Sequence, residues 1–360
     1  MKYFILSIGL LFNTVIGAQK KQEPIRGIWI TNVASKALLS EKNIKEAVKL
    51  CKEQGLNTIY VVVWNGGLTV YPSDVVESYI GVRQHPVYKG FDPIKCIIKE
   101  GHQLGLKVHA WFEFGFSYAY KDTTRLWYKK YPHWAGKNSK GELLQKNGFY
   151  WWSAMHPQVQ EFMKKLVVEV VTKYKVDGIQ GDDRLPAMPA EGGYDTATLA
   201  LYKSETGKAA PALFNEPGWL QWKADKISVF GKSLYTLVKN TRSNCIVSWA
   251  PSIYPWSKEQ YLQDWPAWLN GGYADNIMPQ LYRYNIEAYE KILKELNSQV
   301  TADQKKKIFP GILTSLGDGY LVKPELLQQM IQLNRKYGFE GECMFYFETL
   351  NRLKQKVYAE

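Results

Sequence analysis

The 360-residue sequence has few cysteines and histidines, and several motifs that would define a class of protein are absent. Its four cysteines show no Cys-x-x-Cys spacing and its five histidines show no ligand spacing, so no metal site is indicated. No Gly-rich phosphate loop follows the first expected strand, and no Gly-x-Ser-x-Gly motif surrounds Ser248. We therefore expect no cofactor, no essential metal, no serine-hydrolase chemistry and mostly buried free thiols.

Long hydrophobic runs are also missing, apart from one near the N-terminus. The apolar run 3–16 is shorter than the about 20 residues that span a bilayer, which disfavours a membrane anchor. Lys2 precedes this run and Gly17-Ala18 follows it, the pattern of a signal peptide over residues 1–18. We expect an exported protein, periplasmic or extracellular, with no stable membrane anchor once the signal is removed.

No Pro/Gly/Ser-rich linker or low-complexity tract divides the remainder, so we expect one domain over residues 24–360 and a monomer. The formal net charge is +12, and removal of residues 1–18 takes away only Lys2, leaving +11. A positive exported protein attracts anionic polymers, although basic blocks are more often only solvated surface. Export makes nucleic acid a poor candidate partner.

Eight apolar, strand-like segments alternate with helical patterns along the chain. This alternation favours a parallel sheet, and eight units favour its closure into a (β/α)8 TIM barrel. A doubly wound open sheet is the alternative, without its usual phosphate loop. Ser40 and Asp92 are suited to cap helices. The expected strands are residues 27–31, 58–64, 107–112, 178–182, 246–249, 276–281, 308–312 and 342–347.

The lengths of the connections indicate which end of the barrel carries the site. Connections from helix to strand are short, whereas those from strand to helix are long, as in residues 65–91, 114–157 and 184–218. Barrel enzymes build their substrate sites from long loops at the carboxyl ends of the strands. We expect the site there.

Two adjacent carboxylates, Asp182 and Asp183, end the fourth expected strand. Burying unpaired charges costs several kcal/mol, so these side chains are expected at the open end of the strand. Neighbouring carboxylates raise one another's proton affinity. We take Asp182 as candidate nucleophile or base and Asp183 as the residue that positions or tunes it. A helix cap, loop staple or cation ligand is the structural alternative.

Glycoside hydrolysis needs a second carboxyl group across the scissile bond, at about 5 to 9.5 Å. Neighbours on one strand rarely bracket a sugar ring, so the partner is expected from another strand end. Glu113 closes the third strand and Glu348 the eighth, and either is a candidate acid. Each could instead be a structural, salt-bridged glutamate.

Aromatic residues are abundant, with 13 tryptophans and 24 tyrosines, and many fall at expected strand ends. Flat rings with polar edges suit the faces of sugars, although many of them would simply fill the core, Trp29 and Trp64 first among them. Gln280 and Tyr282 share a strand face and could bind hydroxyl groups. The candidate substrate-binding residues are Trp29, Trp64, Trp111, Gln180, Trp249, Gln280 and Tyr282.

Several short runs, in this order, resemble the bacterial glycosyl hydrolase-like family ten over residues 26–348. The likeness implies a (β/α)8 barrel that hydrolyses glycan chains, with peptidoglycan strands among the substrates associated with the group. Two positions depart from the family: Gln180-Gly181 replaces its usual His-Phe, and Glu113-Phe114 its usual Asn-Pro. The matching runs are Arg26-Gly27-Ile28-Trp29, Gly90-Phe91-Asp92-Pro93, His109-Ala110-Trp111, Val176-Asp177-Gly178-Ile179, Asp182-Asp183 and Pro279-Gln280-Leu281-Tyr282.

These observations together predict an exported glycoside hydrolase that cleaves a polysaccharide by carboxylate catalysis, with peptidoglycan glycan strands as one candidate substrate. The alternative is a non-catalytic glycan-binding barrel whose carboxylates only hydrogen-bond the sugar. A third class, a scaffold or adhesin, would have no deep cleft.

Overall fold

Eight parallel strands form the centre of the computed structural model, which describes residues 23–121, 126–317, 319–353 and 355–358. The expected signal peptide, residues 1–18, lies outside the described residues. All eight expected strands are present. They are β1 (Arg26–Ile30), β2 (Thr58–Val62), β5 (Lys107–Phe112), β9 (Gly178–Gly181), β10 (Ile246–Trp249), β11 (Asn276–Ile277), β12 (Gly311–Leu313) and β15 (Glu342–Phe345).

The order of the strands is that of a barrel. The sheet runs β11-β10-β9-β5-β2-β1-β15-β12, and every neighbouring pair is parallel. Its two edges meet, because Ile277 N donates to Lys307 O at 2.8 Å and Leu281 N donates to Gly311 O at 2.9 Å. The sheet therefore curls into a TIM-type barrel, which confirms the expected fold class.

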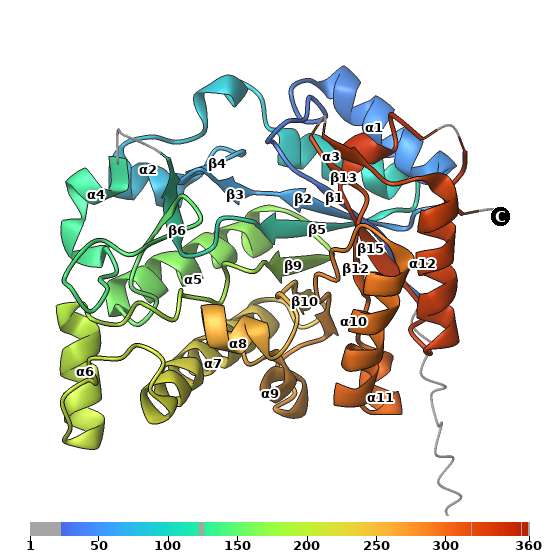
Figure 1. The fold of residues 1–360 in the computed structure, drawn as a ribbon. Helices are drawn as coiled ribbons and strands as arrows, with labels where there is room; N and C mark the ends of the chain where they lie inside the picture. The colour runs from blue at the N-terminus through green and yellow to red at the C-terminus, as the bar shows by residue number, and fades with distance from the viewer. Residues whose placement is uncertain (1–22, 122–125, 318, 354, 359–360) are drawn as a thin grey trace, which may run out of the picture.

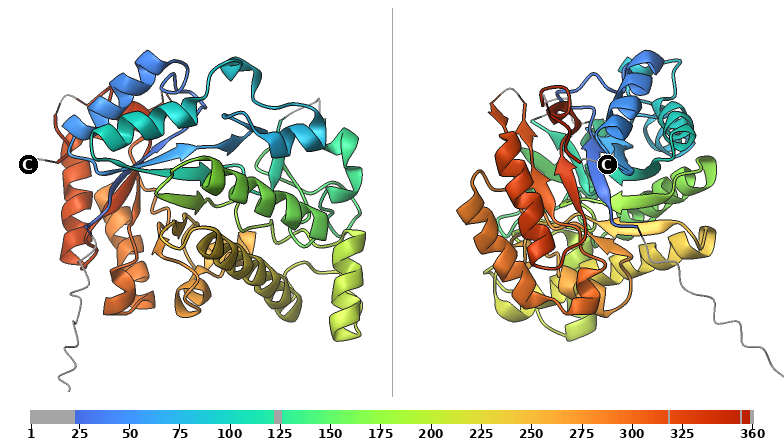
Figure 2. Two further views of the ribbon diagram at one scale, coloured as in Figure 1. Left: turned by 180° about the vertical axis from the view of Figure 1, so that it is seen from behind. Right: turned by 90° about the vertical axis from the view of Figure 1, so that its right-hand side faces the viewer.

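Helices surround the strands (Figures 1 and 2). Two of the expected caps are confirmed: Ser40 accepts from Asn43 N, and Asp92 accepts from Ile94 N and Lys95 N. After β15 the described chain forms only the short 3-10 helix η3 (Phe347–Thr349), so an eighth outer helix is absent from the described residues. The outer helices are α1 (Glu41–Glu53), α3 (Pro93–Gln103), α5 (Pro157–Lys173), α7 (Pro217–Thr241), α9 (Trp265–Asn270), α10 (Ile286–Gln299), α11 (Ala302–Lys305) and α12 (Pro324–Lys336).

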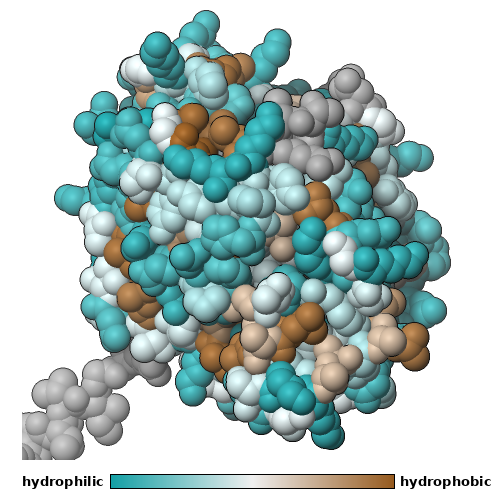
Figure 3. Space-filling model, turned by 90° about the vertical axis from the view of Figure 1, so that its left-hand side faces the viewer, coloured by the Kyte–Doolittle hydropathy of each residue, from teal (hydrophilic) through white to brown (hydrophobic). Residues whose placement is uncertain are grey.

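The long connections carry small elements of their own, and several of them, such as α2, α4, α6 and β6, lie at the left of Figure 1, where the carboxyl ends of β2, β5 and β9 point. Figure 3 shows this side of the molecule, which is mostly hydrophilic with separate hydrophobic patches. These small elements are β3 (Trp64–Asn65), β4 (Leu68–Thr69), α2 (Asp74–Ile80), η1 (Pro86–Tyr88), β6 (Ser117–Tyr120), α4 (Leu126–Lys130), η2 (Pro132–Trp134), β7 (Gln145–Lys146), β8 (Phe149–Trp151), α6 (Thr196–Thr206), α8 (Trp256–Tyr261), β13 (Ser315–Leu316) and β14 (Tyr320–Leu321).

Large aromatic rings fill the inside of the barrel. The ring of Trp29 lies 6.1 Å from that of Tyr60, 6.3 Å from that of Trp111 and 6.2 Å from that of Phe345, between centroids. The four cysteines are free thiols, three of them buried, as expected. Within the described residues, no helix has the length and apolar character needed to cross a membrane.

Candidate active site

Backbone packing at the end of β9 places the two aspartates. The ideal Cβ position on Gly181 lies 2.2 Å from Leu185 O and 2.7 Å from the Trp249 ring, so only glycine fits there. Leu185 N donates to Asp182 O at 3.0 Å, which closes a turn directly after the strand. The glycine of the departing pair Gln180-Gly181 thus has a steric reason in this chain.

Arg184 contacts three carboxylates of the site. Its Nη2 atom lies 3.3 Å from Asp182 Oδ2 and 3.9 Å from Glu113 Oε1. Its Nη1 atom lies 2.9 Å from Asp183 Oδ1, although that oxygen accepts no hydrogen bond from the described residues. Arg184 Nε also donates to Glu113 O at 2.8 Å, which ties the loop after β9 to the end of β5.

Glu113 is held from the side of β1 and β2. Thr31 Oγ1 donates to Glu113 Oε2 at 2.9 Å, and Asn65 Nδ2 donates to the same oxygen at 2.8 Å. Asn65 in turn is fixed by Asn32 Oδ1 at 3.0 Å. The Glu113 carboxylate therefore sits between residues from the ends of three neighbouring strands.

Asp182 is held from the side of β11. Gln280 Nε2 donates to Asp182 Oδ1 at 2.8 Å and to Ala250 O at 3.0 Å. The prediction that Gln280 binds substrate hydroxyls stays untested, but this amide already has a structural task. It fixes the orientation of the Asp182 carboxylate.

The two carboxyl groups lie close enough to act on one bond. Because one Arg184 nitrogen is 3.3 Å from Asp182 Oδ2 and 3.9 Å from Glu113 Oε1, these oxygens are at most about 7 Å apart. Glycosidases separate their two carboxyl groups by about 5 to 9.5 Å. The side chains are 6% and 13% exposed, so each still reaches solvent.

Burial favours protonation of both groups. Burial, followed by the charge of Asp183, raises the pKa of Asp182 well above its usual range, against the opposing effect of Arg184. Burial likewise raises the pKa of Glu113, while Arg184 and the hydrogen bond from Thr31 oppose it. Three carboxyl groups facing one guanidinium retain a proton more readily than isolated ones.

Tyr282 lies beside this group, with its ring 5.5 Å from that of Phe345. Burial, and next the Asp182 carboxylate, raise the pKa of Tyr282 well above its usual range. Its phenol therefore stays a hydrogen-bond donor, as its expected role toward sugar hydroxyls requires.

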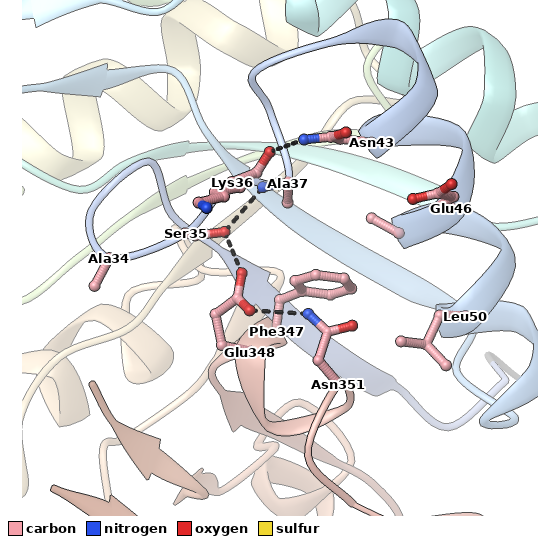
Figure 4. Close-up of a pocket in the computed structure, with 11 residues that line it drawn as sticks. Ala34, Ser35, Lys36, Ala37, Asn43, Glu46, Leu50, Phe347, Glu348 and Asn351 are labelled. Atoms are coloured by element: carbon pink, nitrogen blue, oxygen red, sulfur yellow. Dashed lines mark hydrogen bonds between the residues drawn. The ribbon is translucent and has the colours of Figure 1, made fainter. Parts of the chain in front are cut away.

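Glu348 is placed differently from Glu113. It borders a cavity between η3 and α1 (Figure 4), where it accepts hydrogen bonds from Ser35 Oγ at 2.6 Å and Asn351 Nδ2 at 2.8 Å. Within the described residues no hydrogen bond or ion pair joins Glu348 to Asp182, Asp183 or Arg184. Of the two candidate acids, the structure brings only Glu113 to the aspartates.

The four tryptophans named as candidates for substrate binding are at most 1% exposed, so they fill the core, the alternative expected first for Trp29 and Trp64. Gln180 is also fully buried, where its Oε1 accepts from Trp29 Nε1 at 2.6 Å. These side chains have no surface for a sugar, because they fill the barrel or the layer between barrel and helices. The tryptophans are Trp29, Trp64, Trp111 and Trp249.

Two accessible aromatic residues, Phe149 beside Arg184 and Tyr120 beside Phe149, form a surface that we call the aromatic ledge. Phe149 of β8 stands 4.7 Å from the Cζ atom of Arg184, and its ring centroid is 4.7 Å from that of Tyr120 in β6. Tyr120 is 47% exposed. Sequence reasoning missed both, and it missed Arg184, whose place directly after Asp182-Asp183 was the available signal.

A closed parallel barrel with a carboxyl pair at the carboxyl ends of its strands is the architecture of many glycoside hydrolases. The chain belongs to the Glycosyl hydrolase-like 10 family, which matches residues 24–329 and confirms the resemblance read from the sequence. Relatives include the Glycosyl hydrolase DigH of Escherichia coli (strain K12), 27% identical over 200 residues, which are 46% of this chain and 43% of DigH. The chain thus covers less than half the length of that relative.

The Glycosyl hydrolase YngK of Bacillus subtilis (strain 168) is 23% identical over 387 residues, covering 97% of this chain and 72% of YngK. Among solved structures, the PgaB (BpsB) glycoside hydrolase domain from Bordetella bronchiseptica has a TM-score of 0.69 at 13% identity and covers 93% of this chain and 97% of that one. The catalytic domain of a β-amylase from Paenibacillus polymyxa has a TM-score of 0.62 at 10% identity, with 90% and 92% covered. At these identities the structures support the fold alone.

Proposed function

We propose that this protein is an exported glycoside hydrolase that cleaves a polysaccharide with Asp182 and Glu113 as its carboxyl pair. The observation that carries the proposal is the joint contact of both groups with Arg184, which keeps their facing oxygens within about 7 Å of each other, below the upper limit of about 9.5 Å for glycosidases. Membership of the Glycosyl hydrolase-like 10 family supports the same chemistry.

The electrostatics favour Asp182 as the general acid. Burial and the neighbouring Asp183 raise its pKa well above the usual range, so Asp182 holds a proton that it can give to the glycosidic oxygen. Burial raises the pKa of Glu113 as well, but the charge of Arg184 and the hydrogen bonds from Thr31 and Asn65 to Glu113 Oε2 oppose that effect and favour the ionised carboxylate. Glu113 then acts as base or nucleophile. This reverses the assignment expected from the sequence, where Asp182 was the nucleophile or base.

Arg184 and Gln280 position the pair. Arg184 sets the spacing of Asp182 and Glu113 and offsets part of their negative charge. Gln280 holds the other Asp182 oxygen, which leaves Oδ2 on the side of Arg184. The aromatic ledge of Phe149 and Tyr120 offers sugar rings a flat surface next to the reacting groups.

For the substrate, we propose an anionic glycan, with peptidoglycan strands stripped of peptide as the first candidate. Such strands carry a free carboxylate on alternate sugars, and the formal net charge of +12 on the whole chain attracts them. Export, through a signal peptide at residues 1–18, would bring the protein to such a polymer.

The test is hydrolysis by the purified mature protein of peptide-free peptidoglycan strands and of a panel of neutral and acidic polysaccharides. On the cleaved substrate, Asp182→Asn and Glu113→Gln should each lower kcat about 10² to 10⁴-fold. On an aryl glycoside with a good leaving group, Asp182→Asn should lose far less, because such a group departs without protonation, whereas Glu113→Gln should lose activity on both.

Full activity of Asp182→Asn on the polysaccharide would contradict the assignment. Tight binding of a glycan by the unaltered protein with no cleavage of any substrate would favour the non-catalytic glycan-binding barrel instead.

A further inference from the structure

A cavity of about 710 Å³ lies apart from the carboxyl pair, between the loop after β1, one face of α1 and η3 (Figure 4). This volume is within the about 300 to 1,000 Å³ of small-molecule sites. Both polar and apolar side chains line it. Glu348 points into it from below, Lys36 and Asn43 lie above, and Glu46 stands on the helix side.

Glu348 is a fixed acceptor in this cavity. Ser35 Oγ donates to one of its oxygens at 2.6 Å and Asn351 Nδ2 to the other at 2.8 Å. Both donors are neutral, and within the described ranges no cation forms an ion pair with Glu348. Each carboxylate oxygen accepts more than one hydrogen bond, so Glu348 keeps acceptor capacity for a ligand that donates.

The rest of the lining matches a ligand with an apolar face and polar edges. Ala47, Leu50 and Phe347 supply apolar surface, while Glu46 supplies a second carboxylate, whose nearest cation, Lys42, is 3.9 Å away. A sugar ring has this combination, because its C–H groups form apolar faces and its hydroxyl groups donate from the edges.

The cavity and the carboxyl pair share one loop. Thr31, which holds Glu113, and Ser35, which holds Glu348, are four residues apart, so their Cα atoms lie within about 14 Å of each other. One short loop therefore contributes a contact to each site, and a glycan chain of several units is long enough to span the distance between these two contacts.

We propose that this cavity is a distal subsite, which binds a sugar unit of the same glycan chain through hydroxyl groups that donate to Glu348. The inference rests on the proposed function for the identity of the ligand. It gives Glu348, expected from the sequence as a candidate acid, a binding task instead.

The experiment measures binding directly, in the Asp182→Asn background, by calorimetry with peptide-free peptidoglycan oligosaccharides fractionated by length and with neutral chitooligosaccharides of matched length. Adding Glu348→Gln should weaken binding of the long oligosaccharides of both series at least about tenfold, the effect of a lost hydrogen bond to a charged group. Binding of the shortest ones should be unchanged. Leu50→Trp, which fills the cavity without altering Glu348, should show the same dependence on length.

Glu53→Gln is the matched control, since Glu53 is an exposed carboxylate on the same helix whose partner is Lys49 at 3.6 Å. It should change nothing. In the protein with Asp182 intact, Glu348→Gln should raise KM for long chains and leave kcat unaltered.

Equal affinities of Glu348→Gln and its parent for all lengths would overturn the subsite, as would a loss of the same size for the shortest oligosaccharides. Because binding is measured without turnover, a length-dependent effect would uphold the subsite even if the protein hydrolysed nothing, and the two proposals can fail separately.

Discussion

At the scale of single residues, Arg184 decides the electrostatics of the site. Its guanidinium lowers the pKa of Asp182 and of Glu113, whereas burial, the larger effect in both cases, raises them. The balance leaves both pKa values raised, so a proton stays in the pair as the pH increases. The proposed acid loses this proton, and activity is lost with it, only as the pH rises through the raised pKa of Asp182.

Removal of this arginine gives a prediction with a definite sign. In Arg184→Gln the pKa of Asp182 should rise further, because the guanidinium that opposes the effect of burial is gone. The alkaline limb of the pH–kcat profile should therefore move to higher pH, alongside a lower maximal rate. Arg184→Lys keeps the positive charge and should return the alkaline limb most of the way to its position in the unaltered protein. An alkaline limb that moves to lower pH in Arg184→Gln would contradict the account.

At the scale of elements, the turn after β9 depends on the absence of a side chain at Gly181. In Gly181→Ala the new methyl group would meet the Leu185 carbonyl at 2.2 Å, so the backbone must shift and carry Asp182 with it. We expect a loss of about 1 to 3 kcal/mol in the free energy of unfolding, measured in urea, together with a lower kcat. Gly218→Ala is the control, since a Cβ atom on Gly218 would meet nothing closer than the Glu216 carboxylate, at 3.4 Å. An unaltered kcat in Gly181→Ala would show that the turn does not set the position of Asp182.

A buried lysine of α7 holds the long loop after β9 in place through hydrogen bonds to backbone carbonyl oxygens. Lys223 Nζ donates to the carbonyl oxygens of Ala190, Gly192 and Phe214, and burial lowers its pKa to about 7. Lys223→Met leaves these carbonyls without their donor, which should cost about 1 to 3 kcal/mol. Lys232→Met, at an exposed position of the same helix, should cost little.

The cost of Lys223→Met should also depend on pH in a fixed direction. The folded protein releases the Lys223 proton near pH 7 and the unfolded chain near 10.5, so the unfolded chain binds more protons between these values. Rising pH therefore stabilises the unaltered protein relative to Lys223→Met. Urea unfolding should show a larger difference at pH 9 than at pH 7, and a smaller difference at pH 9 would contradict the lowered pKa.

At the scale of the whole molecule, the excess of positive charge acts on long polymers. With a formal net charge of +12, attraction of an anionic glycan should weaken as salt shortens the Debye length from about 10 Å at 0.1 M to about 3 Å at 1 M. We expect kcat/KM on peptide-free peptidoglycan strands to fall with added sodium chloride. Cleavage of a neutral glucan, if it is a substrate, should change little and serves as the control. Salt-independent cleavage of the anionic strands would remove the electrostatic argument for them.

The sequence by itself determined the barrel, because its signals are local. Strands and helices differ in the spacing of apolar residues over a few positions, and helix caps such as Ser40 and Asp92 act on their own neighbours. The same local logic placed Asp182, Asp183 and Glu113 at strand ends. Since the carboxyl ends of parallel strands all lie at the same end of the barrel, these residues must lie at that end.

Only the tertiary structure decided which of these residues meet. Trp29, Trp64, Trp111 and Trp249 were candidates for sugar binding or for the core, and packing against distant segments buries all four. Glu113 and Glu348 were both expected to end strands, but Glu348 lies in η3, beyond the end of β15. The loop after β1 holds Glu113 at the aspartates through Thr31, and it holds Glu348 in a separate cavity through Ser35. Contacts between residues far apart in the chain set both outcomes. Such contacts cannot be predicted from the spacing of residues along a single sequence.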